Sequence, residues 1–366
     1  MSAFDPTALV RAHIHTLPAY EPILPFEVLS RQLGLPSERI VKLDANENPY
    51  GALPGAMRLL GEMPYPHIYP DPSSLLLREA LSAQLGVPAE NLLAGAGADE
   101  LIDLVLRLLI EPGDTVLICP PTFGMYAFDG NLNRARVVSV PRRDDFALDL
   151  PAIERAVQVE HPKVLFIASP NNPDGSLAPL ADLEQLLALP VLLVLDEAYI
   201  EFAPPGSSLL QQALQRNNLV VLRTFSKWAG LAGLRVGYGA FPAALMPYLW
   251  KIKQPYTVSA AASTAALYSL EHYQELLTVR ERILAERERL FSCLSAVPFL
   301  HPYPSQANFI LCQVEGRDAA QLKQGLARQG VLVRYFNQPG LQDCLRISVG
   351  RPEHTDRLIA AFNSVP

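Results

Sequence analysis

The chain has 366 residues, of which 49% are hydrophobic, and a chain of this length and composition can bury a large core divided over two domains. Its net charge is -7 and it contains no run of lysine or arginine, which argues against a nucleic-acid or membrane-surface partner. The four cysteines and seven histidines show none of the spacings typical of zinc sites or disulfide frameworks, so we expect no metal. Small-molecule chemistry is the favoured class of function.

The N-terminal region is rich in proline, and we expect it to carry no signal peptide. The first stretch, MSAFDPTALVRAHIH, lacks the zones of a signal peptide, and no apolar segment is long enough to span a bilayer, so we expect a cytoplasmic protein. The 33 prolines of the chain are densest within residues 1–70, which indicates extended backbone. We predict that residues 1–30 form an arm that reaches a neighbouring subunit of a homodimer.

Residues 31–255 are predicted to form a large α/β domain. From about Asn91, short apolar runs alternate with amphipathic stretches of helical length. The runs are continuously apolar, which is typical of strands buried on both faces, so we predict a mainly parallel, mixed sheet sandwiched by helices. The predicted strands are 115–119, 136–140, 163–169, 191–199, 219–226 and 235–241, and the predicted helices of this region are 98–110 and 179–189.

The amino-acid composition of the chain changes after Pro255. A long helix rich in glutamate and arginine is predicted over 271–294, where charges four residues apart suit a solvated face. Strands near 307–314, 331–336 and 344–350, a helix near 318–329 and a last helix from Pro352 follow. Residues 256–366 are therefore predicted to form a smaller α+β domain.

Chemically active side chains follow three neighbouring predicted strands. Asn172 lies in SPNNPDG after the strand at 163–169, Asp196 and Tyr199 lie in DEAY, and Lys227 lies in TFSK. In an open α/β sheet, functional side chains gather just beyond the carboxyl ends of the strands, so we expect these groups to lie close together. A lysine in the apolar, glycine-rich segment TFSKWAGLAGLRVGYG can act as a nucleophilic amine.

Pyridoxal phosphate would give each of these groups a role. Lys227 would hold the cofactor aldehyde as a Schiff base, and the carboxylate of Asp196 would keep the pyridine nitrogen protonated. Asn172 and Tyr199 would donate hydrogen bonds to the ionised phenolic oxygen of the ring. Lys227, Asp196 and Tyr199 are the predicted catalytic residues.

The remaining parts of the cofactor also have candidate partners. The phosphate needs hydroxyls, a guanidinium and the free N–H groups of a helix start, and an aromatic ring after a strand can stack on the pyridine. The candidates are Thr224, Ser226, Arg235, the amides of Ala98 and Asp99, and the ring of Phe123.

Simpler interpretations exist for single residues and for one motif. Asp196 alone could cap a helix, Asn172 could form a turn, Phe123 could be plain core and Lys227 could lie in solvent. The segment GAGADE at 95–100 has two glycines of a dinucleotide fingerprint but not the third, which leaves a nicotinamide-dependent dehydrogenase as a poorer alternative. Only the cofactor hypothesis accounts for all of these residues together.

The motifs resemble those of the fold-type I, pyridoxal-phosphate-dependent aminotransferases, and among these the histidinol-phosphate aminotransferase group. The similarity spans nearly the whole chain, and the lysine segment with its AGLRVG tail is its most specific part. The other matching segments are LDANENPYG (43–51), YPDPSS (69–74), GAGADELI (95–102), PPTFGMY (120–126), SPNNPDG (169–175), DEAY (196–199), QANFIL (306–311) and CLRISVG (344–350).

The resemblance implies roles that the residue pattern alone does not give. Tyr69 is expected to reach the cofactor phosphate of the partner subunit, and Arg346 to bind the substrate anion. Arg334 and Tyr20 are expected to help hold a substrate phosphate. Arginine suits a site that must accept a carboxylate or a phosphate, because its planar fork donates two parallel hydrogen bonds. For Arg334, simple surface charge is an equal alternative.

The implied reaction is reversible transamination of L-histidinol phosphate with 2-oxoglutarate, giving imidazole acetol phosphate and L-glutamate in histidine biosynthesis. The chain departs from the family pattern in three places. Phe123 replaces the more usual tyrosine, Asp174 replaces the usual threonine, and the arm has AYEPILP (19–25) in place of a glycine-containing version. These departures leave open an aromatic amino-acid aminotransferase, a phosphothreonine decarboxylase, or a non-catalytic protein that binds the cofactor.

Overall fold

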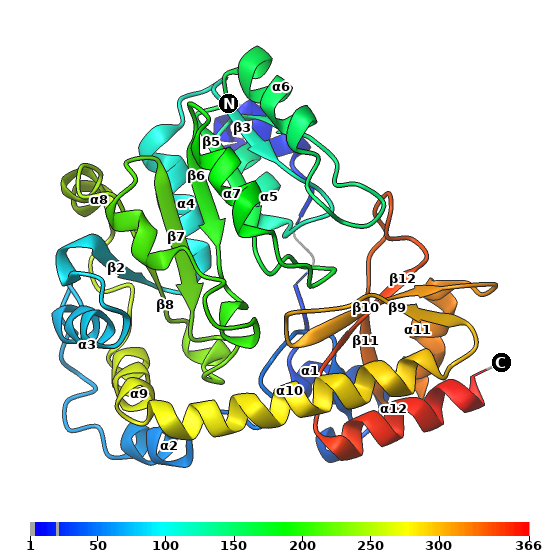
Figure 1. The fold of residues 1–366 in the computed structure, drawn as a ribbon. Helices are drawn as coiled ribbons and strands as arrows, with labels where there is room; N and C mark the ends of the chain where they lie inside the picture. The colour runs from blue at the N-terminus through cyan, green and yellow to red at the C-terminus, as the bar shows by residue number, and fades with distance from the viewer. Residues whose placement is uncertain (1–3, 20–21, 366) are drawn as a thin grey trace.

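The structure is a computed structural model that describes residues 4–19 and 22–365, and its strands form two sheets (Figure 1). The larger sheet has the order β2-β8-β7-β6-β5-β3-β4, and all of its neighbouring strands are parallel except where β8 pairs. Its strands are β2 (Leu92–Gly95), β3 (Thr115–Ile118), β4 (Arg136–Ser139), β5 (Val164–Ala168), β6 (Leu192–Asp196), β7 (Leu219–Thr224) and β8 (Gly237–Ala240). The predicted mainly parallel sheet is confirmed.

Both faces of the larger sheet are covered, as the continuous apolar runs predicted. Side chains alternate along β5, so that Phe166 and Ala168 pack with α4 (Ala98–Leu109) and α8 (Met246–Ile252). Leu165 and Ile167 point to the opposite face. That face is covered by α6 (Leu150–Glu160) and α7 (Leu180–Leu187) (Figure 1). The sheet is therefore the middle layer of a three-layer α/β sandwich.

The smaller sheet has the order β1-β11-β12-β10-β9 and combines both ends of the chain. Its strands are β1 (Val41–Leu43), β9 (Leu300–Pro302), β10 (Phe309–Val314), β11 (Val331–Tyr335) and β12 (Cys344–Ser348). Strand β1 runs parallel to β11, with Val41 opposite Val331. The predicted boundary at residue 31 thus places β1 in the large domain although its hydrogen bonds belong to the C-terminal sheet. The three residues of β1 pair with residues nearly 300 positions later in the chain, and so short a strand gives no local signal that it joins the C-terminal sheet.

Helix α10 (Tyr273–Ser295) extends beneath both sheets, from the region of α9 (Ala260–Glu271) to that of α12 (Pro352–Ser364) (Figure 1). The long charged helix predicted at 271–294 is therefore present, but it begins two residues later because His272 separates it from α9. The remaining helices are α1 (Phe26–Leu33), α2 (Pro54–Gly61), α3 (Leu75–Leu85), α5 (Met125–Leu132) and α11 (Ala319–Arg328). No helix among the described residues is long and apolar enough to cross a membrane.

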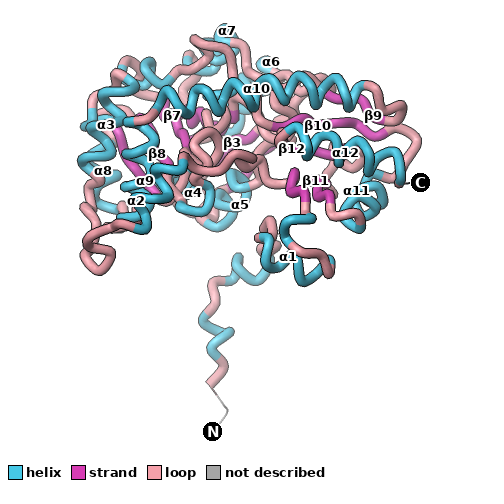
Figure 2. Tube along the Cα trace, turned by 90° about the horizontal axis from the view of Figure 1, so that it is seen from below, coloured by secondary structure: helices cyan, strands magenta, loops and turns pink. Residues whose placement is uncertain are grey.

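The N-terminal segment leaves the body of the chain, as Figure 2 shows. It contains two short 3-10 turns, Pro6–Leu9 and Ala12–Thr16, and none of the residues in either turn is buried. His13 contacts the end of α5 through the carbonyl of Leu132, at 3.3 Å. The predicted arm and the division into two domains remain predictions.

Candidate active site

The carboxyl ends of β5, β6 and β7 open into one cavity of about 130 Å³. Asn172, Asp196 and Lys227 come from these three strand ends and all line it. The structure thus brings together the groups that the sequence placed at successive strand ends. The cavity is lined by Ala98, Asp99, Phe123, Tyr126, Ala168, Asn172, Asp196, Ala198, Tyr199, Thr224, Ser226, Lys227, Ala232 and Arg235.

Lys227 is the third residue after the end of β7, and its side chain lines the cavity. Nζ donates a hydrogen bond to the carbonyl of Ala45 at 3.3 Å and lies 5.8 Å from the centre of the Tyr199 ring. Among the described residues it has no carboxylate within ion-pair distance. A lysine amine held without an acidic partner, next to an aromatic ring, is available to react with a carbonyl group.

Asp196 is the last residue of β6 and is almost completely buried. Its Oδ2 accepts a hydrogen bond from the Tyr126 hydroxyl at 2.6 Å, and its Oδ1 accepts one from the Ala198 amide at 2.9 Å. Burial raises the pKa of Asp196 to about 6, which the bond from Tyr126 opposes. A cationic group beside this carboxylate, such as a protonated pyridine nitrogen, would stabilise its ionised form.

The start of α4 and the end of β7 form a cup of hydrogen-bond donors. Helix α4 begins at Ala98 without any side-chain cap, so its first N–H groups are available to an anion. Thr224 Oγ1 and Ser226 Oγ lie 2.9 Å apart. Arg235 Nη1 lies 3.5 Å from Ser226 Oγ, and Nη2 lies 2.7 Å from the carboxylate of Asp99. Hydroxyls, amides and a guanidinium together are the donors that a phosphate group requires.

Two glycines permit the close packing around this cup. Gly97 has φ +84, and a Cβ there would lie 2.5 Å from Nη2 of Arg235. Gly237 in β8 would place a Cβ 2.6 Å from the backbone nitrogen of Ala98. Any larger residue would displace the guanidinium or the helix start, so the cup depends on both glycines.

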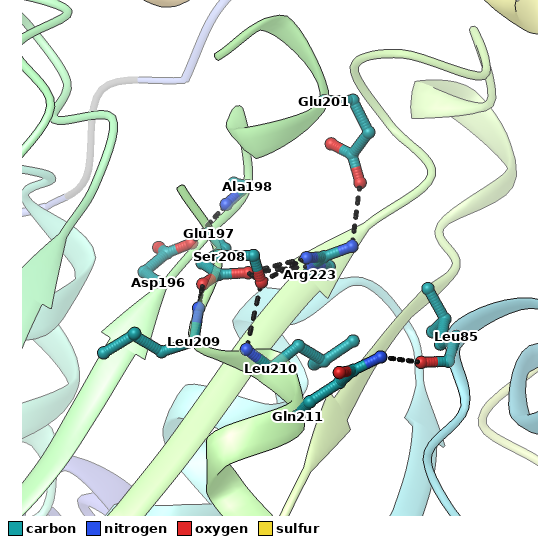
Figure 3. A network of polar contacts seen from close by, with 10 residues as sticks. All are labelled: Leu85, Asp196, Glu197, Ala198, Glu201, Ser208, Leu209, Leu210, Gln211 and Arg223. Carbon is teal, nitrogen blue, oxygen red and sulfur yellow. Dashed lines mark hydrogen bonds and ion pairs between the residues drawn. The ribbon is translucent and has the colours of Figure 1, made fainter. Parts of the chain in front are cut away.

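Asp196 and its neighbour Glu197 have different binding partners, because consecutive side chains along a strand point in opposite directions. Figure 3 shows Asp196 bound by the Ala198 amide, while Glu197 binds Arg223. Glu197 is fully buried, and its Oε2 lies 2.9 Å from two nitrogens of Arg223. It also accepts hydrogen bonds from the Ser208 hydroxyl and the Leu209 amide. This ion pair anchors the carboxyl ends of β6 and β7 below the cavity.

A second cavity of about 250 Å³ adjoins the first and shares four of its lining residues. The shared residues are Phe123, Asn172, Tyr199 and Lys227. The second cavity adds two arginines from the smaller sheet, Arg334 of β11 and Arg346 of β12, which are paired opposite each other. Both arginines thus lie on adjacent strands and line the same cavity as Lys227.

Arg346 connects the smaller sheet to the strand ends of the larger one. Its Nη1 donates to Oδ1 of Asn172 at 2.5 Å, and its Nη2 donates to the carbonyl of Asp44 at 2.8 Å. The guanidinium of Arg334 lies 5.5 Å from the ring of Phe336 and has no ion pair among the described residues. The guanidinium groups of Arg334 and Arg346 therefore both line the second cavity.

Two predicted site residues stand apart from this arrangement. Tyr69 is 79% exposed and its ring is stacked on that of Tyr256, with the centroids 4.7 Å apart, so it does not line the cavity of its own chain. Tyr20 lies outside the described residues. The expected roles of both residues remain predictions.

The structure also identifies site residues that the sequence analysis did not select. Tyr126, which binds Asp196, ends the segment PPTFGMY, and Asn46, which donates to the Tyr199 hydroxyl at 3.1 Å, lies in LDANENPYG. Both segments stood out as motifs, but their spacing from DEAY gave no indication that they approach it. Only the packing of the sheet against α5 and β1 shows these contacts.

Asp174, where the family usually has threonine, supports the loop that holds Asn172. It is buried and accepts hydrogen bonds from the Asn171 side chain and, at 2.8 Å, from the Ser176 amide. Asn171 in turn binds the carbonyl of Pro121 and the hydroxyl of Thr122. The departure from the family pattern thus links two loops at the edge of the site and removes no group from the cavity.

Comparisons with known proteins agree with this site. The family description "Aminotransferase class I and II" matches residues 38–362. Histidinol-phosphate aminotransferase 1 of Arabidopsis thaliana is 54% identical over 96% of this chain and 84% of its own. Histidinol-phosphate aminotransferase of Roseiflexus castenholzii is 51% identical over 98% of both chains.

The fold is likewise shared with a solved structure. Histidinol-phosphate aminotransferase from Sinorhizobium meliloti, solved in complex with pyridoxal-5'-phosphate, has a TM-score of 0.88 and 30% sequence identity, and the match covers 100% of this chain and 98% of the other. The fold-type I architecture predicted from the sequence is confirmed. The chain therefore belongs to the class I and II aminotransferases and, within them, to the family of histidinol-phosphate aminotransferases.

Proposed function

We propose that the chain catalyses transamination between L-histidinol phosphate and 2-oxoglutarate, forming imidazole acetol phosphate and L-glutamate in histidine biosynthesis, with pyridoxal phosphate as cofactor. One observation carries the proposal: the cavity with Lys227 and Asp196 opens directly into the cavity that holds Arg334 and Arg346. Relatives more than 50% identical over nearly the whole chain bear the name of this activity.

The residues of the first cavity fit the cofactor group by group. Pyridoxal phosphate, when bound, supplies an aldehyde that takes up the amino group and a ring that withdraws electrons. Thr224, Ser226 and the start of α4 would hold the phosphate. The ring of Phe123, at the wall of the cavity, would cover one face of the pyridine.

Two charged side chains control the protons in this proposal. Asp196, as a carboxylate, holds a proton on the pyridine nitrogen because burial makes an unpaired negative charge costly there. The amine of Lys227 moves a proton from the substrate carbon that bears the amino group. Asn172 and Tyr199 lie beside them and would donate hydrogen bonds to the phenolic oxygen.

The second cavity suits a substrate that carries an anion. We assign the α-carboxylate of glutamate to Arg346 and the phosphate of histidinol phosphate to Arg334, with Tyr20 as a further donor. Arg346 is buried and fixed by Asn172 and Asp44, whereas Arg334 is only half-buried. A fixed guanidinium suits one carboxylate geometry, and a less constrained one can adjust to either substrate.

The proposal includes a homodimer in which Tyr69 reaches the cofactor phosphate of the partner. Tyr69 belongs to a segment of the chain, residues 57–76, that has other exposed apolar side chains, among them Met57, Tyr65, Ile68 and Leu76. Large exposed apolar residues gathered in one region are typical of subunit interfaces. Sedimentation of the purified protein tests the dimer, and loss of cofactor affinity in Tyr69→Phe tests the reach of the hydroxyl.

A spectral titration tests the reaction. Adding histidinol phosphate to the yellow holoenzyme should remove the visible absorbance of the cofactor, and 2-oxoglutarate should restore it. Lys227→Ala should abolish turnover and the borohydride-stable pyridoxyl label on its peptide, whereas Lys251→Ala, an exposed lysine of α8, should retain both. An unchanged spectrum with every amino donor would refute transamination.

The same titration separates the alternatives. A response to phenylalanine or tyrosine that exceeds the response to histidinol phosphate would identify an aromatic aminotransferase. Release of carbon dioxide from phosphothreonine would identify a decarboxylase of the same fold. Cofactor binding without any turnover would identify a non-catalytic binding protein.

A further inference from the structure

Tyr126 of α5 is a buried tyrosine whose side-chain hydroxyl contacts the carboxylate of Asp196, which lines the first cavity. It is fully buried, and its hydroxyl donates to Oδ2 of Asp196 at 2.6 Å. The other carboxylate oxygen is bound by the Ala198 amide. Hydrogen bonds from a hydroxyl to a carboxylate in this distance range are the strong, charge-assisted kind.

We propose that Tyr126 is a positioning residue, whose hydroxyl fixes the carboxylate of Asp196 in one orientation and in its ionised form for the ring nitrogen of the cofactor. This inference rests on the proposed function for the identity of the cofactor. The orientation and the charge state of Asp196 are properties of the protein alone and can be measured without any substrate.

The position of the Tyr126 hydroxyl is itself tightly constrained. Its ring is stacked on Phe166 of β5, with the centroids 4.8 Å apart and the planes at 7°, and meets Phe123 edge to face at 5.6 Å. Phe166 lies in the strand next to β6, which ends in Asp196. One side chain therefore contacts both the ring expected to cover the pyridine and the carboxylate expected to face its nitrogen.

The charges around Asp196 explain why a donor is needed there. Burial is the largest cause that raises the pKa of Asp196, and the negative charges of Asp99 and Glu197 raise it further. Tyr126 and the Ala198 amide are the two donors that oppose these effects. Lys227 and Tyr199 line the same cavity, but neither is hydrogen-bonded to the carboxylate.

The hydroxyl of Tyr126 remains a donor over the whole working range of pH. Burial and the adjacent Asp196 raise the pKa of Tyr126 well above its ordinary value, and Arg142 opposes this only in part. Removing the hydroxyl leaves Oδ2 of a buried carboxylate without this donor, which favours the protonated acid. A neutral Asp196 would hold the ring nitrogen less well.

Tyr126→Phe tests the proposal, with Tyr238→Phe as the matched control. The substitution keeps the ring that stacks on Phe166 and removes only the hydroxyl. Tyr238 is an equally buried tyrosine of the larger sheet, but its hydroxyl is bonded to Arg223 instead of Asp196. Both variants lose one buried hydroxyl, so any general effect on stability should appear in both.

The first readout is the titration of the Asp196 carboxyl carbon in the cofactor-free protein, followed by carbon-13 NMR with an Asp196→Asn spectrum for assignment. We expect Tyr126→Phe to move the midpoint upward by about one pH unit or more, because a hydrogen bond to a charged group is worth about one pKa unit or slightly more. Tyr238→Phe should leave it unchanged.

The second readout is the affinity for pyridoxal phosphate. If the pKa of Asp196 moves from about 6 to about 7, its ionised fraction falls about twofold at pH 7 and about tenfold at pH 5, and we expect the dissociation constant of Tyr126→Phe to rise by about the same factors. At higher pH Asp196 is ionised in either protein, so the two affinities should converge. An unshifted titration, or the same shift in Tyr238→Phe, would overturn the positioning role. Neither measurement involves turnover, so a negative result would contradict the role of Tyr126 without contradicting the proposed transamination.

Discussion

Glu201, at the edge of the network in Figure 3, provides a stringent test of the electrostatics because its replacement should stabilise the protein. Its side chain is 8% exposed and its Oε1 lies 3.7 Å from Nη1 of Arg223, whereas its Oε2 has no hydrogen-bond partner within residues 4–19 and 22–365. Burial is the main cause that raises the pKa of Glu201 from 4.5 to about 7, and Arg223 counteracts it only in part.

The direction of the pH effect follows from this shift. Between pH 4.5 and 7 the folded state holds the Glu201 proton more tightly than the unfolded state, so this group lowers stability progressively as the pH rises through that window. The difference between 7 and 4.5 corresponds to about 3 kcal/mol at 1.36 kcal/mol per pKa unit. Above pH 7 the full cost of the buried charge is present.

Glu201→Gln replaces the carboxylate by a neutral group of the same shape. We expect the variant to be about 3 kcal/mol more stable than the parent protein at pH 8 and nearly equal to it at pH 5. Equilibrium unfolding in urea at these two pH values, with the cofactor-free protein, measures the difference.

Glu197→Gln is the control, because Glu197 accepts three hydrogen bonds, from Arg223, Ser208 and Leu209, and forms an ion pair with Arg223. Breaking this buried pair should cost about 3–5 kcal/mol at both pH values. If Glu201→Gln were destabilised at pH 8, or stabilised equally at pH 5, the account of Glu201 as an insufficiently compensated charge would be wrong.

Three further predictions concern the cup, the thiols and the second cavity. Gly97→Ala should lower stability by about 1–3 kcal/mol and weaken cofactor binding, because the residue has φ +84 and the new Cβ would displace Arg235; equal affinity for pyridoxal phosphate would contradict the role of the cup. Cys293 should react fastest with a thiol reagent at pH 8, because the other three cysteines are buried and burial raises the pKa of each; two or more fast thiols per native chain would show that one of them is accessible. Arg334→Gln should raise the KM for histidinol phosphate more than the KM for glutamate; an equal rise in both, measured by steady-state kinetics, would exclude a role specific to the phosphate.

Local patterns in the sequence determined the elements of the larger domain. The six predicted strands are all present, because the runs at their centres, such as 164–168 and 219–222, are apolar at every position and must be covered on both faces. Glycine marked the start of α4, and the change in composition after Pro255 marked the long helix. Strand β2 was not among the predicted strands, because its apolar run Leu92–Ala94 is cut short by the glycine-rich segment GAG at 95–97.

The sequence also determined the chemistry of the site, since functional groups at the ends of adjacent parallel strands must converge. Asn172, Asp196 and Lys227 lie in one cavity because β5, β6 and β7 are neighbours in the sheet. Knowledge of the strand order alone is enough to bring these three residues together.

Only the tertiary structure decided which groups fix those side chains. The bond from Tyr126 to Asp196, the bond from Asn46 to Tyr199 and the pairing of β1 with the C-terminal sheet join segments from 70 to almost 300 residues apart. Such contacts depend on how helices and sheets pack in space, and neither the periodicity of a segment nor the spacing of motifs predicts which distant segments will be in contact. The sequence therefore specified which chemical groups meet, and the packing specified how they are held and charged.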